Sequence, residues 1–380
     1  MPKKQDEDKV KAIFKPDTPL PMWDLYEKIF YVQQLKKYEY FQKKPYISYQ
    51  KNDKLSKQMM EIIKKLEQEN DDFCWSMDWD PLFLSQLIYH GFLTIATKIQ
   101  DDFYVLLPKL HTKRCIVDLN CDNIVKLVKD AGKSKSLRKM CGKYRLSINT
   151  GFKQVFQGCL DKHGESWLYP WMQNILNEMH NNNSNNKYNK VKVISVELWD
   201  IKDGTLVAGE LGTIIGTIYT SLTGFYYKSG TGNVQMLGLQ QYLIMMGFKM
   251  WDLGMFIEYK KQFGGIEIER KKFLAIYNKY RNIDNIIDLK KLHAINNDNN
   301  INTVRDIMNL NRMKYSNNDI DNKEIMDQDM KEDNNNNNNN NNNGNKISKK
   351  HAKRLKRMER RKQAKLRNKN GMKNNENNEN

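Results

Sequence analysis

The chain has 380 residues, enough for one or two domains with a hydrophobic core. Its net charge of +18 favours an anionic partner, nucleic acid before membrane, although an AT-rich coding sequence would explain part of the lysine excess. The five cysteines form no C-x-x-C pair and the six histidines no H-E-x-x-H motif, which argues against a disulfide framework or structural zinc. With no apolar leader and no membrane-spanning run, we expect a cytoplasmic protein and no membrane partner.

Residues 1–71 predict an accessory helical extension, with helices at 24–40 and 55–70 and no functional signal. A small N-terminal domain is expected over residues 72–132, with strands at 103–107 and 114–117. Within it, Asp80 and Pro81 predict a helix start, because a carboxylate caps the first turn and proline suits its first position. Gly91 predicts the end of that helix.

A basic segment opens the next part of the chain, and helices at 152–160 and 167–180 follow it. The segment, residues 133–145, is either a solvated face or a patch that binds RNA phosphates. Its cations include Lys135, Arg138, Lys139 and Lys143. The asparagine-rich residues 181–189 are expected to form a surface loop.

Residues 191–254 carry the clearest structural pattern. Strands are predicted at 191–200, 205–215 and 217–227, with a hairpin turn at Asp203-Gly204 and a bend at Gly216. The turn at 229–232 leads into a helix that Gly247 ends, and a final strand follows at 248–253. This order is typical of an N-acetyltransferase core. We therefore expect an α+β fold whose N-acetyltransferase-like catalytic domain, a mixed sheet with helices, spans residues 133–281 and ends in a helix at 269–281.

The C-terminal part loses apolar periodicity from about residue 282. Residues 282–345 are expected to be a low-complexity linker and residues 346–380 a disordered basic tail. Residues 346–373 contain fourteen lysines and arginines against one glutamate. Phosphate binding is the favoured interpretation of this tail, and the alternatives are a nuclear-targeting signal or an inert tail.

Short sequence pieces between residues 72 and 277 occur in the order found in one family. They are Asp80-Pro81-Leu82, Gly91-Phe92, Ser136-Leu137-Arg138-Lys139, Tyr144-Arg145, Gln154-Val155, Gly158-Cys159, Trp167, Ser195-Val196-Glu197-Leu198-Trp199, Leu206-Val207, Gly209, Gly212, Gly216-Thr217 and Trp251-Asp252. Together they resemble the leucyl/phenylalanyl-tRNA–protein transferases, which transfer an aminoacyl group from tRNA to a protein N-terminus.

The resemblance implies aminolysis of an aminoacyl ester, with no cofactor, metal or covalent intermediate. Its partners would be aminoacyl-tRNA and the N-terminal amines of acceptor proteins, which the transfer marks for degradation. Positioning supplies much of such a rate, and the incoming amine needs a proton acceptor. Asp252 matches the family's key aspartate and is expected to hold the amine or accept its proton; otherwise it is a solvent-facing strand end. Gly254 stands where the family usually has glutamine, and Leu222 where it has glutamate.

The resemblance also implies an aminoacyl pocket and an RNA-binding cluster. Trp167 and Tyr219 match pocket aromatics, unless they are core residues, and Glu197 would orient a neighbour. Arg138, Lys139 and Lys143, with Lys135 beside them, resemble the basic cluster that meets the acceptor stem.

Glu210 stands where the family has an apolar residue, commonly methionine. A buried carboxylate there would favour a basic aminoacyl group, arginyl first, over leucyl. The alternatives are that Glu210 faces solvent or that the alignment is shifted by one residue.

Two other functions remain open from sequence. The fold suits an acetyl-CoA-dependent N-acetyltransferase, and the charge suits a non-catalytic RNA-binding protein on the same scaffold. The sequence leaves open the accepted N-terminal residues and the oligomeric state.

Overall fold

The computed structural model describes residues 25–49, 54–100, 103–131, 133–185, 187–188, 190–283 and 301–316. All of them fall within one unit, Met1–Asn317. The second unit, Asn318–Asn380, contains the expected basic tail and lies outside the described residues.

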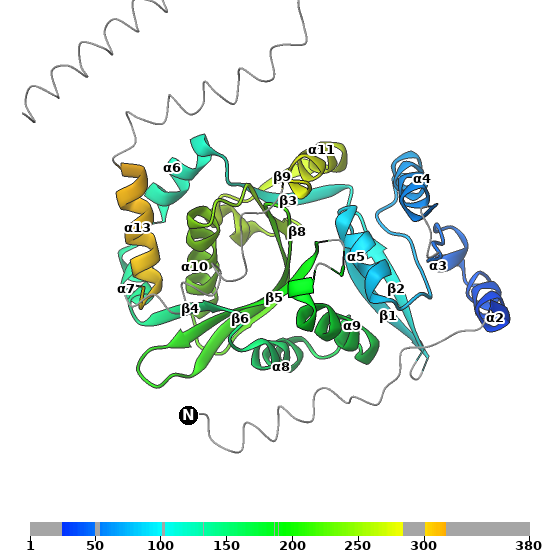
Figure 1. Cartoon of the computed structure of the whole chain (residues 1–380), viewed down its shortest axis with the longest axis horizontal. Coiled ribbons are helices and arrows are strands. Elements are labelled where there is room, and N and C mark those ends of the chain that lie inside the picture. The colour runs from blue at the N-terminus through cyan, green and yellow to red at the C-terminus, as the bar shows by residue number, and fades with distance from the viewer. Residues whose placement is uncertain are drawn as a thin grey trace, which may run out of the picture. The chain divides into compact units, whose positions relative to one another are not determined.

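A seven-stranded mixed sheet forms the centre of the first unit (Figure 1). Its strands are β3 (Lys113–Asp118), β4 (Tyr144–Ile148), β5 (Lys192–Asp200), β6 (Leu206–Ile215), β7 (Ile218–Tyr226), β8 (Met250–Gly254) and β9 (Ile266–Glu269). They lie in the order β4-β5-β6-β7-β8-β3-β9. All neighbours are antiparallel except β7 and β8, which run parallel because helix α10 (Thr231–Met245) connects them. The α+β fold and the strands expected over residues 191–254 are confirmed.

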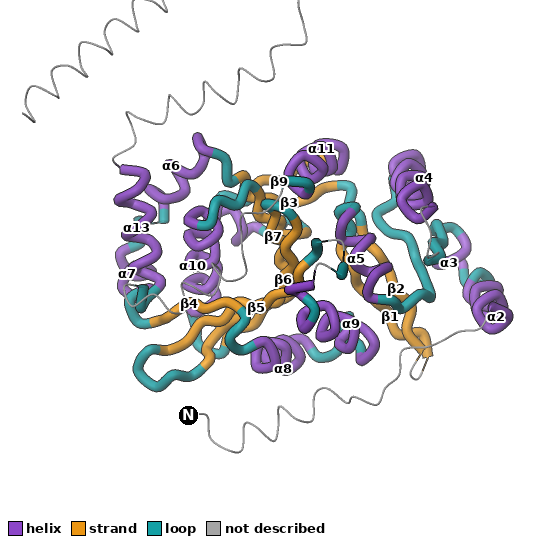
Figure 2. The backbone as a smooth tube through the Cα atoms, viewed as in Figure 1, coloured by secondary structure: helices purple, strands orange, loops and turns teal. Residues whose placement is uncertain are grey.

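Helices cover both faces of the sheet (Figure 2). Helices α8 (Phe152–His163) and α9 (Pro170–Asn181) pack on one face, and α10 packs on the other with α13 (Val304–Ser316) against it. Successive strand residues point to opposite faces. Val193 therefore joins the core that contains α8 and α9, whereas Ile194 joins the core that contains α10.

The turn before α10 opens the helix as expected. Gly230 is the N-cap residue with φ of 80°, a left-handed conformation that glycine adopts without strain. The helix ends at Met245, and Gly247, also left-handed with φ of 79°, reverses the chain into β8.

The N-terminal part carries a second sheet. Strands β1 (Leu93–Gln100) and β2 (Phe103–Lys109) pair antiparallel, and α5 (Pro81–Tyr89) packs beside β1. Asp80 caps α5 by accepting from the N–H groups of Leu82 and Phe83, so the predicted helix start is confirmed. The remaining helices of the described chain are α2 (Leu25–Leu35), α3 (Glu39–Gln42), α4 (Lys54–Gln68), α6 (Cys121–Asp130), α7 (Lys135–Cys141), α11 (Arg270–Arg281) and the short 3₁₀ turns η1 (Asn183–Asn185) and η2 (Glu258–Phe263).

Several sequence-based expectations differ from the structure. Helix α9 starts at Pro170 rather than at residue 167, because proline suits the first helical position. The expected loop at 181–189 is partly internal: the amide of Asn183 is buried, donates to the carbonyl of Val193 and accepts from its N–H.

Two segments that the sequence pattern assigns to other parts of the chain belong to the domain of the large sheet. Strand β3 lies between β8 and β9, although it was expected in the small N-terminal domain. Helix α13 lies in the segment expected to be a low-complexity linker, and buries Val304, Ile307 and Met308 against α10 and its neighbours. Strand β9 was not predicted.

Candidate active site

A cleft of about 530 Å³ opens between β7, the start of α10 and the segment from Leu253 to Lys260. Its polar and charged lining comes from separate elements: β6 supplies Glu210, β7 supplies Ser221, α10 supplies Gln235 and η2 supplies Lys260. Such a volume suits a ligand of the size of a nucleoside or an amino acid.

Glu210 lies at the inner side of this cleft, with only 5% of its surface exposed. Its Oε1 accepts hydrogen bonds from the hydroxyls of Tyr219 at 2.7 Å and Ser221 at 2.8 Å. Its Oε2 accepts one from the side-chain amide of Gln235 at 3.0 Å. The expectation of a buried Glu210 therefore agrees with the structure, and the solvent-facing alternative does not.

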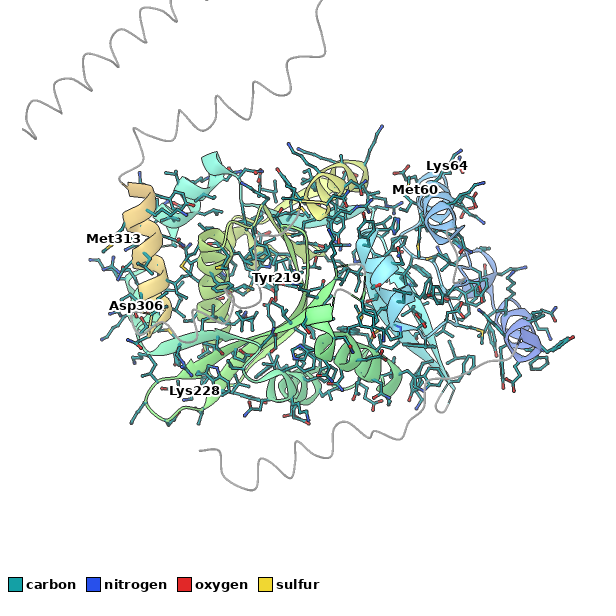
Figure 3. All side chains as sticks on the ribbon, in the orientation of Figure 1. Met60, Lys64, Tyr219, Lys228, Asp306 and Met313 are labelled. Atoms are coloured by element: carbon teal, nitrogen blue, oxygen red, sulfur yellow. The ribbon has the colours of Figure 1, made fainter. Side chains whose placement is uncertain are left out.

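The donors around Glu210 are held by their own neighbours. The indole N–H of Trp251 donates to the Ser221 oxygen at 2.9 Å, which leaves the Ser221 hydrogen for Glu210. Tyr219, near the centre of Figure 3, is fully buried, and burial first and Glu210 second raise its pKa well above the ordinary value. It is thus a neutral donor. A Cβ at Gly212 would overlap the Tyr219 ring, so only glycine leaves room there.

Burial raises the pKa of Glu210, because the three neutral hydrogen bonds and the positive charge of Lys260 only partly offset the lost hydration. Lys260 lines the same cleft without forming an ion pair with Glu210, and burial lowers its pKa. The cleft therefore contains an acidic side chain, Glu210, and a basic one, Lys260, that form no ion pair with each other.

Asp252 lies on the opposite face of the sheet from Glu210. On β8, Met250 packs with the core that contains α8 and α11, whereas Trp251 packs with the core that contains α10. Strand alternation places Asp252 on the side of Met250. Asp252 is fully buried, and its two oxygens accept from Nε and Nη2 of Arg114, each at 2.8 Å.

Two further donors complete the surroundings of Asp252. The hydroxyl of Thr220 donates at 3.2 Å and the N–H of Gly254 at 3.0 Å. Asp252 therefore does not line the cleft, and direct contact with a substrate amine would require Arg114 to move aside. The role of Arg114 could not be predicted from the sequence, because a lone arginine in an apolar strand 138 residues from Asp252 gives no local signal.

Glu197 and Trp167 also lie away from this cleft. The carboxylate of Glu197 is fully buried and accepts from the hydroxyls of Ser147 and Ser195 and from the N–H of Gly151, contacts that join β5 to the loop before α8. Burial raises its pKa, and these hydrogen bonds oppose the rise. Trp167 packs half-buried against the core around α8 and α9.

The four predicted RNA-binding cations lie together and are exposed. Lys135, Arg138 and Lys139 belong to α7, and Lys143 directly precedes β4. The Arg305 guanidinium of α13 donates to the carbonyls of Arg138 and Lys139, so α13 supports this helix and adds a cation beside it.

No group of three metal-ligating side chains occurs within the described residues. None of the helices in the described part of the chain has the length and apolarity needed to cross a membrane.

The order of the strands agrees with the N-acetyltransferase-like α+β fold expected from the sequence. Residues 125–278 match the family model described as Leucyl/phenylalanyl-tRNA protein transferase. Curated relatives with that name from Shewanella sediminis (strain HAW-EB3) and Shewanella baltica (strain OS155 / ATCC BAA-1091) are each 28% identical over 39% of this chain. These matches confirm, over residues 125–278, the resemblance to the leucyl/phenylalanyl-tRNA–protein transferase family seen in the sequence.

The match is partial on both sides. The chain covers 59% and 61% of the length of these two relatives. Among solved structures, that of FemX is 12% identical, with a TM-score of 0.31 over 57% of this chain and 75% of FemX. A TM-score of this size does not bear on function.

Proposed function

We propose that this chain transfers an amino acid from aminoacyl-tRNA to the N-terminal α-amine of acceptor proteins and thereby marks them for degradation. The observation that carries the proposal is the cleft with a buried carboxylate and a cationic rim, in a segment that matches the model of a transferase family of this kind. The reaction needs two substrates held together, an ester carbonyl and an amine, and an open cleft meets that need.

The rim of the cleft suits the 3′ end of a tRNA. Lys162 and His163 line it, as do Ser229 and Gly230 at the start of α10, where backbone N–H groups favour an anion. Tyr226 and Tyr259 also line the cleft, and both are about half exposed. Exposed aromatic rings beside cations are a common arrangement for stacking an unpaired base and binding its phosphate.

We propose further that the transferred amino acid is basic, arginine first. Glu210 is buried without a cation in contact, which disfavours its ionised form until a positive group arrives. A carboxylate has about four acceptor positions, and neutral donors occupy three here. The position left on Oε2 accommodates one charge-assisted hydrogen bond from a guanidinium or ammonium, rather than a bidentate pair.

Asp252 is proposed to hold the cleft wall in position from the opposite face of the sheet. Its pair with Arg114 joins β8 to β3, and β8 carries Leu253 into the wall of the cleft. In this role Asp252 is a positioning residue. That Asp252 itself receives the proton of the amine remains a prediction, and it requires the Arg114 pair to open.

Both proposals are tested by measuring aminoacyl transfer from charged tRNA to a peptide N-terminus. Purified protein is incubated with labelled arginyl-tRNA and leucyl-tRNA, singly and in competition, and with peptides that differ in their first residue. We expect labelled peptide, with arginine preferred over leucine. Preference for leucine would refute the arginine proposal alone. If neither label is transferred, stabilisation by acetyl-CoA would support an N-acetyltransferase, and tRNA binding without turnover a non-catalytic RNA-binding protein.

A further inference from the structure

Lys260 is the buried lysine of the cleft. It lies on η2, is 8% exposed, and is the one buried lysine in the described part of the chain. Lysine is almost never buried unless its ammonium finds partners. Here Nζ donates to the carbonyl of Leu253 at 2.6 Å and to that of Met255 at 2.7 Å.

These contacts leave one donor for a ligand. An ammonium has three N–H groups, and the two carbonyls take two of them. Lys260 and Leu253 both line the cleft, so the lysine and one of the two residues that hold its Nζ belong to the cleft wall. The third N–H is therefore held in place before any substrate arrives.

We propose that Lys260 donates this N–H to the carbonyl oxygen of the aminoacyl ester and stabilises the negative charge that develops there. This inference rests on the proposed function. The amine nitrogen forms a bond to the ester carbon, and the C=O electron pair moves onto the oxygen that Lys260 holds. When the C–O bond to the ribose breaks, that pair returns to form the amide, and the ribose oxygen takes up the proton released by the amine.

The other basic side chains that line the cleft are less suited to this role. Lys162 and His163 are exposed, and the Lys162 ammonium lies 4.9 Å from the centre of the Tyr226 ring. Solvent screens an exposed charge, whereas a preorganised donor in a site of low dielectric acts on the transition state at full strength. Lys260 combines burial with fixed orientation, while Glu210 across the cleft would hold the substrate's cationic group.

Only the ammonium form of Lys260 can act in this way. Burial lowers its pKa most; Cys115, Asp252 and Glu210 oppose that shift, and Arg114 adds to it. Transfer should accordingly decline at high pH as Lys260 loses its proton, at a lower pH than for an exposed lysine.

The experiment compares Lys260→Met and Lys260→Arg with Lys261→Met, which removes an exposed neighbouring charge outside the cleft. We expect Lys260→Met to lower kcat by about 10²- to 10³-fold with KM for aminoacyl-tRNA unchanged, as for the loss of one oxyanion donor. Lys260→Arg should recover part of the rate, and Lys261→Met should behave as the wild type. The wild-type decline at high pH should move upward in Lys260→Arg, because arginine keeps its proton.

Folding is checked by thermal melting, since Lys260 also bridges two carbonyls. If Lys260→Met does not fold, the inference is still tested by comparing the pH at which transfer declines in the wild type and in Lys260→Arg. An unchanged kcat in folded Lys260→Met, a rise in KM alone, or an unshifted decline in Lys260→Arg would overturn the inference and leave the proposed function standing. Absence of transfer by the wild type would overturn both.

Discussion

Replacing Glu210 with glutamine removes the negative charge from the cleft and keeps the shape of the side chain. Tyr219 and Ser221 are hydroxyls that can accept as well as donate, and the Gln235 amide can reverse, so the new amide can be hydrogen-bonded. The Glu210→Gln variant should therefore fold. A cationic aminoacyl group, by contrast, loses its counter-ion.

The size of the effect depends on the acceptor positions of the carboxylate. With one position left on Oε2, Glu210 offers a cationic side chain one charge-assisted hydrogen bond. A hydrogen bond to a charged group contributes about 1.5–3 kcal/mol. Since each 1.36 kcal/mol is tenfold in rate, the preference for arginyl- over leucyl-tRNA should fall by roughly 10- to 150-fold.

The assay is a competition between the two charged tRNAs for one acceptor peptide, read as the ratio of kcat/KM values. Glu210→Met, which installs the residue common in the family, should reduce arginyl transfer further and favour leucyl. Thermal melting of each variant shows whether the fold is intact. If Glu210→Gln keeps the wild-type ratio, Glu210 does not recognise the transferred side chain.

Three further predictions concern stability and RNA binding. Because burial raises the pKa of Glu210 above its ordinary 4.5, its stabilising contribution is fully present below pH 4.5 and is lost as pH rises through the folded-state value. The unfolding free energy of the wild type relative to Glu210→Gln should therefore fall as pH rises, and a pH-independent difference in urea titrations would contradict the shift. Asp252→Asn should destabilise the protein by about 3–5 kcal/mol, because it leaves the Arg114 guanidinium buried without its counter-charge. A wild-type urea midpoint in that variant would refute this, and loss of transfer with full stability would instead support a direct role for Asp252. Lys139→Ala should weaken tRNA binding and reduce the slope of log affinity against log salt by about one, whereas the control Lys64→Ala, an exposed residue of α4 (Figure 3), should leave it unchanged.

Features that depend on neighbouring residues could be predicted from the chain. The start of α5 is set by Asp80 and Pro81, whose capping carboxylate and fixed φ act within one helical turn. The strands at β5, β6 and β7 were predictable from their β-branched and aromatic residues and from the glycines at their turns. The order of the short sequence pieces was enough to recognise the resemblance to the transferase family.

Contacts between distant segments could not be predicted from the sequence and are seen only in the tertiary structure. Alternation along β8 places Asp252 and Trp251 on opposite faces, but only the packing of α10 and α11 decides which face meets the cleft. The pairing of Arg114 with Asp252 and the position of Lys260 beside the carbonyls of Leu253 and Met255 depend on strand order and on the path of the loop after β8. A charged residue looks the same in a sequence whether it is solvated or buried. Its environment, and with it its pKa and its chemistry, is set by the residues that tertiary packing brings around it.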